Sequence, residues 1–424
     1  MRLSEADGLA RGACSHYDVT RMTRSTFAAL ASRNYRLYWI GLVCYVLGHR
    51  AEYVTFAWMV WEVSHDPLYL GYLGLAQGVP LVVFQLFGGV LADRVNRLRL
   101  LIGTQVLTAA TLGIAFGLSV AGLVRVGQLL ALAALSSTFR AFDEPTRLSL
   151  IPQLVERERL ANAIALGSIP WQASRIIGPS VTGILIAAFG GTVGFGLAAG
   201  ASVGALLLYS RLRLRADPSQ SARAHMMRQL VEGLSFVAHD FVFAALIGLA
   251  LFNAVFGLSY VTLLPIFADV YFGTGSTGYG LLNAAHGIGA FVGTLTVATT
   301  AHLIARPGPA LLVTAVGMGL ALMVFSTSPG MAMALSMLVL VGFANTFYLT
   351  QVSTFIQSNV PDRLRGRVLS IYALCWNLLP LGGLIGGALA AAVDARFAVA
   401  FGGAMVAINA LVLLTSRRLR ALGY

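Results

Sequence analysis

The stretch Gly88-Gly89-Val90-Leu91-Ala92-Asp93-Arg94-Val95-Asn96-Arg97-Leu98-Arg99-Leu100 decides the fold of this chain. It lies between two long apolar runs, with paired glycines at the end of the first run and then three arginines within six residues. Two membrane helices joined this tightly must turn at the edge of the bilayer, and the cytoplasmic loops of membrane proteins collect positive charge. The stretch therefore predicts a short cytoplasmic turn between two membrane-spanning helices.

The composition extends this interpretation to the whole chain of 424 residues. Hydrophobic residues make up 57% and charged residues only 11%, and the mean hydropathy is +0.78. A soluble protein carries about 25% charged residues. The net charge of +12 comes from arginine without any lysine, and it lies in short loops between apolar runs rather than on one soluble face. We therefore expect an all-α polytopic membrane protein in a lipid bilayer, without a nucleic-acid partner.

The apolar runs predict twelve transmembrane helices, because a spanning helix needs about 20 apolar residues. With both termini cytoplasmic, nearly all loop arginines fall on the inner side, Arg140 and Arg147 among them, and only Arg125 and Arg396 fall outside. The expected helices are 37–61, 69–92, 99–121, 125–143, 160–188, 190–211, 240–268, 277–302, 309–327, 331–357, 365–392 and 396–416.

A central polar stretch divides the helices into two sets of six, and the two sets resemble each other. Gly71-Tyr72 before the second helix recurs 207 residues later as Gly278-Tyr279 before the eighth. Duplicated bundles around a site near the membrane midplane are a transporter design. The expected units are a disordered cytoplasmic tail (1–33), an N-terminal bundle (34–211), a cytoplasmic linker (212–239), a C-terminal bundle (240–416) and a cytoplasmic tail (417–424).

The stretch from Gly89 to Leu100 resembles the signature loop of the major facilitator superfamily, G-x-L-A-D-R-x-G-R-[RK]-x. Asn96 replaces the usual glycine, and asparagine tolerates a left-handed backbone better than most residues, so we expect the turn to survive. Within the superfamily, the segments 34–39, 143–147 and 365–368 resemble the branch of enterobactin exporters and macrolide efflux proteins. The resemblance implies a secondary transporter, driven by the proton gradient, that exports a drug, siderophore or other small amphipathic metabolite.

The resemblance also implies that Asp93 is a cytoplasmic latch. Its carboxylate would cap the helix that starts near Gly366 and Arg367, or pair with Arg140, since anions are favoured at helix N-termini. The alternative is a solvated acid that only helps to set the topology. The residues expected at this inner gate are Gly89, Asp93, Arg94, Arg97, Arg140, Arg365, Gly366 and Arg367.

Candidates for proton coupling lie about 15 residues into the first helix. An ionisable group at that depth is costly unless it is paired or faces water. His49 and Glu52 are three residues apart and share a helix face. Burial penalises the charged form of a carboxyl group, so Glu52 is a candidate for proton exchange, which Arg50 would oppose if it lay close. The alternative is a structural ion pair between Glu52 and an arginine such as Arg175.

The fifth helix contains Gly178, Pro179 and Gly183, which permit a bend and close helix contact. They partly resemble the helix 5 signature of exporters, G-P-x-x-G-G, although Thr182 takes the place of one glycine. Ordinary helix packing is the alternative for this motif.

Polar and aromatic side chains inside otherwise apolar helices are candidates for lining a substrate cavity, and each has the alternative of bonding a neighbouring helix. We expect Trp61 at the outer membrane interface instead, where tryptophan is enriched. The cavity candidates are Gln77, Trp171, Gln172, Asn253, Asn283, His286, Asn345, Gln351, Trp376 and Asn377.

The sequence shows no P-loop, no cluster of histidine and cysteine suited to a metal, and no nucleophile with a base. We therefore expect no enzyme activity, nucleotide, metal or cofactor beyond the proton gradient. The prediction is a monomeric antiporter in the cytoplasmic (inner) membrane of a bacterium. The alternatives are an importer or lipid flippase on the same scaffold, or a membrane receptor or scaffold without transport.

Overall fold

The computed structural model describes residues 27–213, 234–300, 307–376 and 378–422, and the side chains of 86–94, 362 and 363 lie outside this description. The described residues are helical or lie in short connections. The long helices are α2 (Arg33–Ser64), α3 (Pro67–Arg94), α4 (Arg97–Val120), α5 (Val126–Leu154), α6 (Leu160–Phe189), α7 (Gly191–Tyr209), α11 (Gly275–Thr300), α12 (Pro307–Ser326), α13 (Met331–Asn359) and α16 (Ala395–Leu414). Shorter segments are η1 (Ala28–Ala31), η2 (Arg157–Arg159), α9 (Phe241–Phe252), η3 (Asn253–Gly257), α10 (Tyr260–Ile266), η4 (Phe267–Tyr271), α14 (Asp362–Trp376), α15 (Leu379–Ala392) and α17 (Arg417–Arg420).

Nine helical spans in the described residues are long and apolar enough to cross a membrane. Two of them combine shorter segments, from α9 through η4 and from α14 through α15. Three further helices, α2, α5 and α6, have 32, 29 and 30 residues and carry charged side chains near their centres. The chain is therefore a multi-pass membrane protein.

The turn between α3 and α4 is present as expected, and Asn96 stabilises it. The Asn96 backbone is extended (φ −61°, ψ 114°), and its side-chain oxygen accepts a hydrogen bond of 3.0 Å from the Arg99 amide. Asn96 is thus the N-cap of α4, and the turn forms without the left-handed conformation that asparagine tolerates. An asparagine at this position satisfies one of the backbone N–H groups that the first turn of a helix leaves free.

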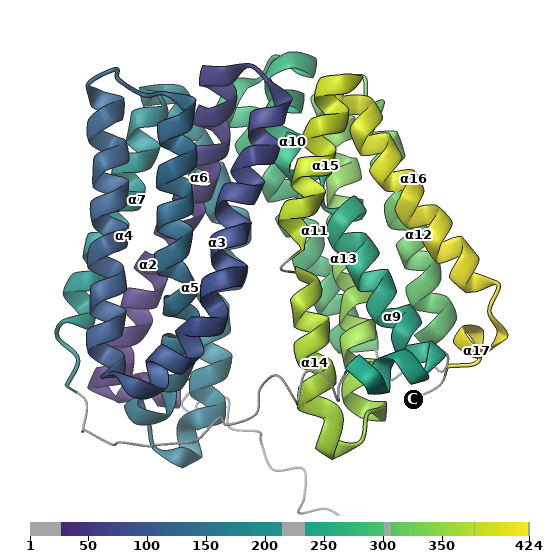
Figure 1. Cartoon of the computed structure of the whole chain (residues 1–424), viewed down its shortest axis with the longest axis horizontal. Coiled ribbons are helices and arrows are strands. Elements are labelled where there is room, and N and C mark those ends of the chain that lie inside the picture. The colour runs from purple at the N-terminus through teal and green to yellow at the C-terminus, as the bar shows by residue number, and fades with distance from the viewer. Residues whose placement is uncertain (1–26, 214–233, 301–306, 377, 423–424) are drawn as a thin grey trace, which may run out of the picture.

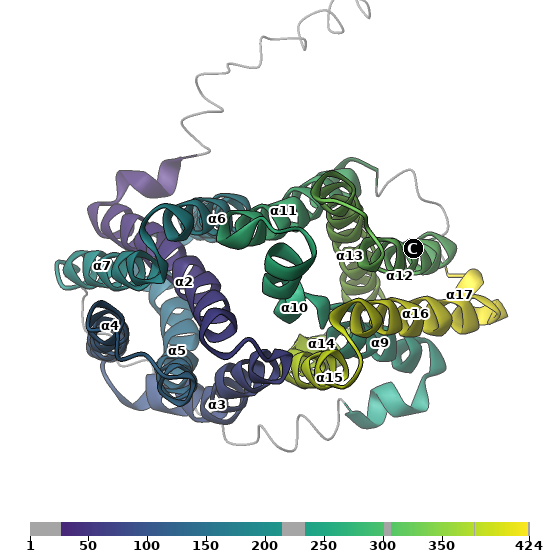
Figure 2. The ribbon, with the colours of Figure 1, turned by 90° about the horizontal axis from the view of Figure 1, so that it is seen from above.

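The helices form two bundles, α2 to α7 and α9 to α17 (Figure 1). Seen from above, the bundles meet where α6 lies beside α11 and where α3 lies beside α15, and α10 adds contacts with α2 and α3 (Figure 2). The helices at these two contacts, α3 and α6, are the second and fifth long helices of the first bundle. Their partners α15 and α11 belong to the fifth and second spans of the second bundle. The two contacts are therefore related by the internal repeat.

The bundles are sealed together at one end, which we call the closed end and which holds the α2–α3 connection. A Cβ at Gly183 of α6 would lie 2.9 Å from Gly280 Cα and would overlap the carbonyl oxygen of Ser276 on α11. The Trp61 indole donates a hydrogen bond of 2.9 Å to Asp269 across the same end. At the opposite, open end, which holds the α3–α4 connection, the ribbons diverge (Figure 1).

One predicted helix bound was wrong, and another predicted span consists of two helices. The fourth helix does not end at residue 143, because α5 continues to Leu154 and holds Arg140 and Arg147 inside it. Arg147 is tolerated there because its guanidinium forms an ion pair with Asp143 and donates a hydrogen bond to Tyr209, as described below. The span expected at 365–392 is found at Leu364–Ala392, and it comprises α14 and α15, with Pro380 in the first turn of α15. A proline fits the first turn because its nitrogen has no hydrogen to leave unsatisfied.

Candidate functional site

A cavity of about 720 Å³ lies between the two bundles. The N-terminal bundle contributes residues from α2, α3, α5 and α6, and the C-terminal bundle contributes residues from α10, α11, α13, α14 and α15. Most of the wall is apolar, with aromatic rings from Tyr53, Tyr372 and Trp376. A pocket of this size and character is typical of a site for a drug-sized ligand.

A buried polar cluster lies behind one wall of this cavity. Glu52 is only 3% exposed, and it accepts a hydrogen bond of 2.6 Å from the Ser136 hydroxyl. Its other oxygen lies 3.9 Å from both His49 Nδ1 and Arg140 Nη1. The prediction that His49 and Glu52 share a face was correct, whereas the partner of Glu52 is Arg140 rather than Arg175.

The charge state of His49 in this cluster follows from its partner. Arg140 Nη1 lies 2.6 Å from His49 Nδ1, and a guanidinium has donors but no acceptor. His49 Nδ1 therefore accepts the hydrogen bond, and the imidazole is neutral in this arrangement. Arg140 also donates to the Ser137 hydroxyl at 2.8 Å, so it is held at the cavity wall.

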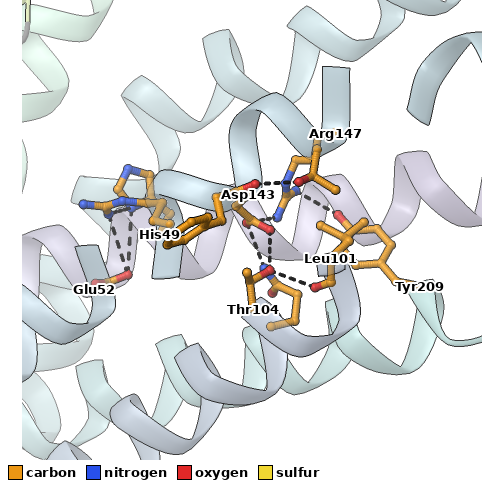
Figure 3. A network of polar contacts seen from close by, with 11 residues as sticks. His49, Glu52, Leu101, Thr104, Asp143, Arg147 and Tyr209 are labelled. Atoms are coloured by element: carbon orange, nitrogen blue, oxygen red, sulfur yellow. Dashed lines mark hydrogen bonds and ion pairs between the residues drawn. The ribbon is translucent and has the colours of Figure 1, made fainter. Parts of the chain in front are cut away.

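A second cluster lies further along α5, toward its C-terminal end (Figure 3). Asp143 accepts hydrogen bonds from Thr104 and Gln105, both at 2.9 Å, and from Arg147 at 2.5 Å. Arg147 also donates to the Tyr209 hydroxyl at 2.9 Å. These contacts tie α4, α5 and α7 together around a neutralised ion pair, which we interpret as a structural clamp of the N-terminal bundle.

Tyr45 connects the two clusters. Its ring lies 3.3 Å beneath the Arg147 guanidinium and stacks on the His49 ring, with 6.1 Å separating its centroid from that of Trp171. Sequence reasoning missed Asp143 and Arg147 as a pair, although their spacing of four residues on a helix is a signal for an ion pair.

The cavity candidates divide into three groups. Gln77, Asn283, His286, Asn345 and Trp376 line the cavity, as do His49, Arg50, Arg140, Arg175 and Pro179. Trp171, Gln172, Asn253 and Gln351 lie outside its lining, so the prediction that they face the cavity was wrong. Asn377 lies outside the described residues.

The cavity candidates that lie outside the lining contact other parts of the protein or are exposed. Asn253, at the start of the π-helical segment η3, donates a hydrogen bond of 2.9 Å to Asn345, so it supports a lining residue from behind. Gln351 is buried within the C-terminal bundle, and Gln172 is exposed. His286 is held by Tyr260, whose hydroxyl lies 2.7 Å from His286 Nδ1.

Trp61 corrects another expectation. It is only 5% exposed, and its indole nitrogen donates to Asp269 between the bundles. It therefore lies at the closed end, but inside the protein and not at a lipid interface. Its neighbour one turn earlier, Trp58, stacks on Tyr279 of α11, so this part of α2 is a contact surface for the second bundle.

The expected latch is only partly visible. The side chains of Gly89, Asp93 and Arg94 lie outside the described residues. Arg97 donates a hydrogen bond of 3.2 Å to the carbonyl oxygen of Ser149. The other expected members occupy the first turns of α14, namely Arg365, Gly366 and Arg367. Arg140 belongs to the Glu52 cluster in the middle of α5, so its predicted place in a cytoplasmic loop was wrong.

The helix 5 motif occupies a contact surface along α6. Gly178 lies against the stem of Arg50, since a Cβ there would be 2.6 Å from Arg50 Cβ. Pro179 lines the cavity, and its carbonyl oxygen lies close to Gly280 of α11. Gly183 lies on the same face of α6, where it contacts α11 at the closed end. The motif therefore lies where the two bundles touch.

Sequence comparison places the chain among membrane transporters. A profile of the major facilitator group described as "Transmembrane secretion effector" matches residues 24–422. The chain is 29% identical to the enterobactin exporter EntS of Citrobacter koseri over 367 residues, which is 84% of this chain and 86% of the relative. It is 28% identical to EntS of Escherichia coli O1:K1 / APEC over 370 residues, with the same coverage.

Solved structures share the fold at low sequence identity. A POT family transporter has a TM-score of 0.72 at 11% identity, covering 92% of this chain and 97% of its own. The nucleoside transporter NupG has a TM-score of 0.71 at 13% identity, covering 90% and 98%. A bacterial homologue of the lysosomal transporter Spinster, in an inward-facing and occupied conformation, has a TM-score of 0.70 at 17% identity, covering 92% and 99%.

Proposed function

Because the chain belongs to the major facilitator superfamily of membrane transporters, we propose that it exports a small amphipathic molecule across the cytoplasmic membrane of a bacterium. The observation that carries this proposal is the cavity of about 720 Å³, which both bundles line and which the closed end seals from one side. Rocking of one bundle against the other would open the closed end and seal the open one, so the cavity would face each side in turn.

The proposed topology has twelve spans, the nine apolar ones together with α2, α5 and α6, and both termini in the cytoplasm. Arginine distribution supports it, because Arg157 and Arg159 lie at the open end whereas Arg125 and Arg396 lie at the closed end. Since cytoplasmic loops collect positive charge, the open end is the cytoplasmic side in this proposal and the cavity faces inward.

Export is favoured over import because the similar proteins of Citrobacter and Escherichia are named as exporters. An amphipathic substrate is favoured by a wall that is mostly apolar and carries a few polar side chains and three aromatic rings. Such rings offer large contact area with little loss of conformational freedom.

We propose proton antiport as the driving reaction, with Glu52 as the group that exchanges the proton. Glu52 is the carboxylate that lies beside a neutral histidine and a cavity-lining arginine. A change in its charge would therefore alter the electrostatic potential at the cavity wall. Asp93 remains a proposed latch at the turn between α3 and α4, where its helix ends one residue later.

The proposal is tested by accumulation of fluorescent amphipathic compounds in bacteria that lack their own efflux pumps. Cells would express the wild-type protein or the Asp93→Asn variant, with and without a protonophore. We expect lower accumulation of at least one compound with the wild type, and loss of that effect with the protonophore and with the variant. Unchanged accumulation of every compound, at equal membrane expression, would contradict export of amphipathic compounds, and raised accumulation would indicate an importer.

A further inference from the structure

We propose that the substrate of this cavity is an aromatic anion, whose negative group binds between Arg50 of α2 and Arg175 of α6. The inference rests on the proposed function only in taking the cavity as the substrate site. It adds the charge of the substrate and the way in which the substrate is oriented between the two bundles.

The first observation is an excess of positive charge on the wall. Arg50, Arg140 and Arg175 line the cavity, and no Asp or Glu is found among the described residues that line it. Glu52 lies behind the wall and directs its oxygens to Ser136, His49 and Arg140. One carboxylate beside three guanidinium groups leaves the described wall positive.

Two of these arginines have no counter-charge among the residues that the structure describes. Arg50 makes one long hydrogen bond, 3.5 Å from its Nε to the Ser174 hydroxyl, which is neutral. Among the residues that the structure describes, Arg175 makes no hydrogen bond and no ion pair. An unpaired charge within a membrane protein is costly and marks a water-filled path or a ligand of opposite charge.

The same bundle shows how an arginine is neutralised when its role is structural. Arg147 pairs with Asp143 at 2.5 Å, donates to Tyr209 and covers the ring of Tyr45. Among the described residues Arg50 has no comparable set of partners, although its stem packs against Gly178 and fixes its position. The Arg50 guanidinium is therefore held at the wall without a counter-charge from the described residues, which is the arrangement of an anion site.

The opposite wall fixes the orientation. The C-terminal bundle contributes neutral polar groups, Asn283, Asn345, Thr346, Thr350 and Ser353, together with the rings of Tyr372 and Trp376. These residues suit an uncharged aromatic body with hydroxyl or carbonyl substituents. A carboxylate, sulfonate or ionised phenol would face the N-terminal bundle, and the ring system would lie against the C-terminal bundle.

The test measures binding to the purified full-length protein and needs no transport. Fluorescein methyl ester and rhodamine 123 share one ring skeleton and one ester, but the first is an anion and the second is a cation near neutral pH. Each is titrated with detergent-solubilised protein, and fluorescence polarisation reports binding. We expect the anion to bind more tightly than the cation, and Arg50→Gln or Arg175→Gln to weaken anion binding about ten- to a hundredfold.

Two further variants separate charge from folding. Arg50→Lys keeps the positive charge and should retain most of the anion affinity, while Arg418→Gln removes an exposed arginine of α17 and should change nothing. Equal or tighter binding of the cation, or anion binding that survives both glutamine substitutions, would overturn the proposal. So would a failure of the anion to bind. Selective, arginine-dependent binding without export in cells would support this inference while contradicting the proposed function.

Discussion

Replacing Gly183 with valine should break the seal at the closed end. A Cβ at this position would lie 2.9 Å from Gly280 Cα and would overlap the Ser276 carbonyl oxygen, and both are backbone atoms that cannot rotate away. Forcing extra methyl groups into a tight contact costs about 1–3 kcal/mol. Since about 1.4 kcal/mol is a factor of ten, the population of the sealed state should fall about five- to a hundredfold relative to states with this end open.

The assay measures distances between pairs of spin labels by double electron–electron resonance, in protein whose native cysteines have been replaced. One pair at positions Leu123 and Val393 reports on the closed end, and a second pair at Glu158 and Ser358 reports on the open end. We expect the Gly183→Val variant to lengthen the distance of the first pair and shorten that of the second.

The matched control is Gly167→Val in the same helix, because a Cβ at Gly167 would meet no atom within 4 Å. This variant should leave both distance distributions as in the wild type. If Gly183→Val also left them unchanged in folded protein, the close contact between α6 and α11 would not be what seals this end, and the reasoning would be refuted.

Three other variants address the polar groups. Glu52→Gln should abolish substrate exchange driven by a pH gradient in proteoliposomes yet preserve counterflow; retained pH-driven exchange would exclude Glu52 as the proton site. Asp143→Asn should destabilise the protein by about 3 kcal/mol, lowering the melting temperature by about 3 °C, because Arg147 loses its counter-charge; an unchanged melting temperature would contradict the clamp. Trp61→Phe removes the hydrogen bond to Asp269 and should cost the sealed state about 1 kcal/mol, seen as a smaller shift in the same spin-label distances.

Most helices could be predicted from the sequence, because a spanning helix corresponds to a long apolar run with charged or glycine-rich ends. The prediction failed where a charge lies inside a helix. The end of α5 was placed at residue 143 because Asp143 and Arg147 read as loop residues, whereas the two charges neutralise each other within the bundle. Asn96 lies at the predicted turn, but the sequence did not show that it caps α4, since asparagine is common both in turns and at helix N-caps.

The candidate site was predictable in kind and only partly in detail. His49, Arg50 and Arg175 stood out because charges within apolar helices are rare, and all three line the cavity. Uncharged polar residues gave no such signal, because the direction of a side chain depends on how its helix is rotated. Asn283 and Asn345 lie on helix faces that point to the cavity, whereas Asn253 lies outside the lining.

The positive wall of the cavity has an electrical consequence. Arg50 and Arg175 have no counter-charge within the described part of the chain. If the cavity faces the two sides of the membrane in turn, their charges move through part of the membrane field whenever the empty protein reorients. A potential of 100 mV, negative inside, is worth about 2.3 kcal/mol for each full charge that crosses it. This field would draw the empty, positive cavity back to face the cytoplasm, while a bound anion would cancel part of the charge and weaken the opposition to the outward step. The arginines would then act as a gating charge, and the membrane potential would favour net export even without a pH gradient.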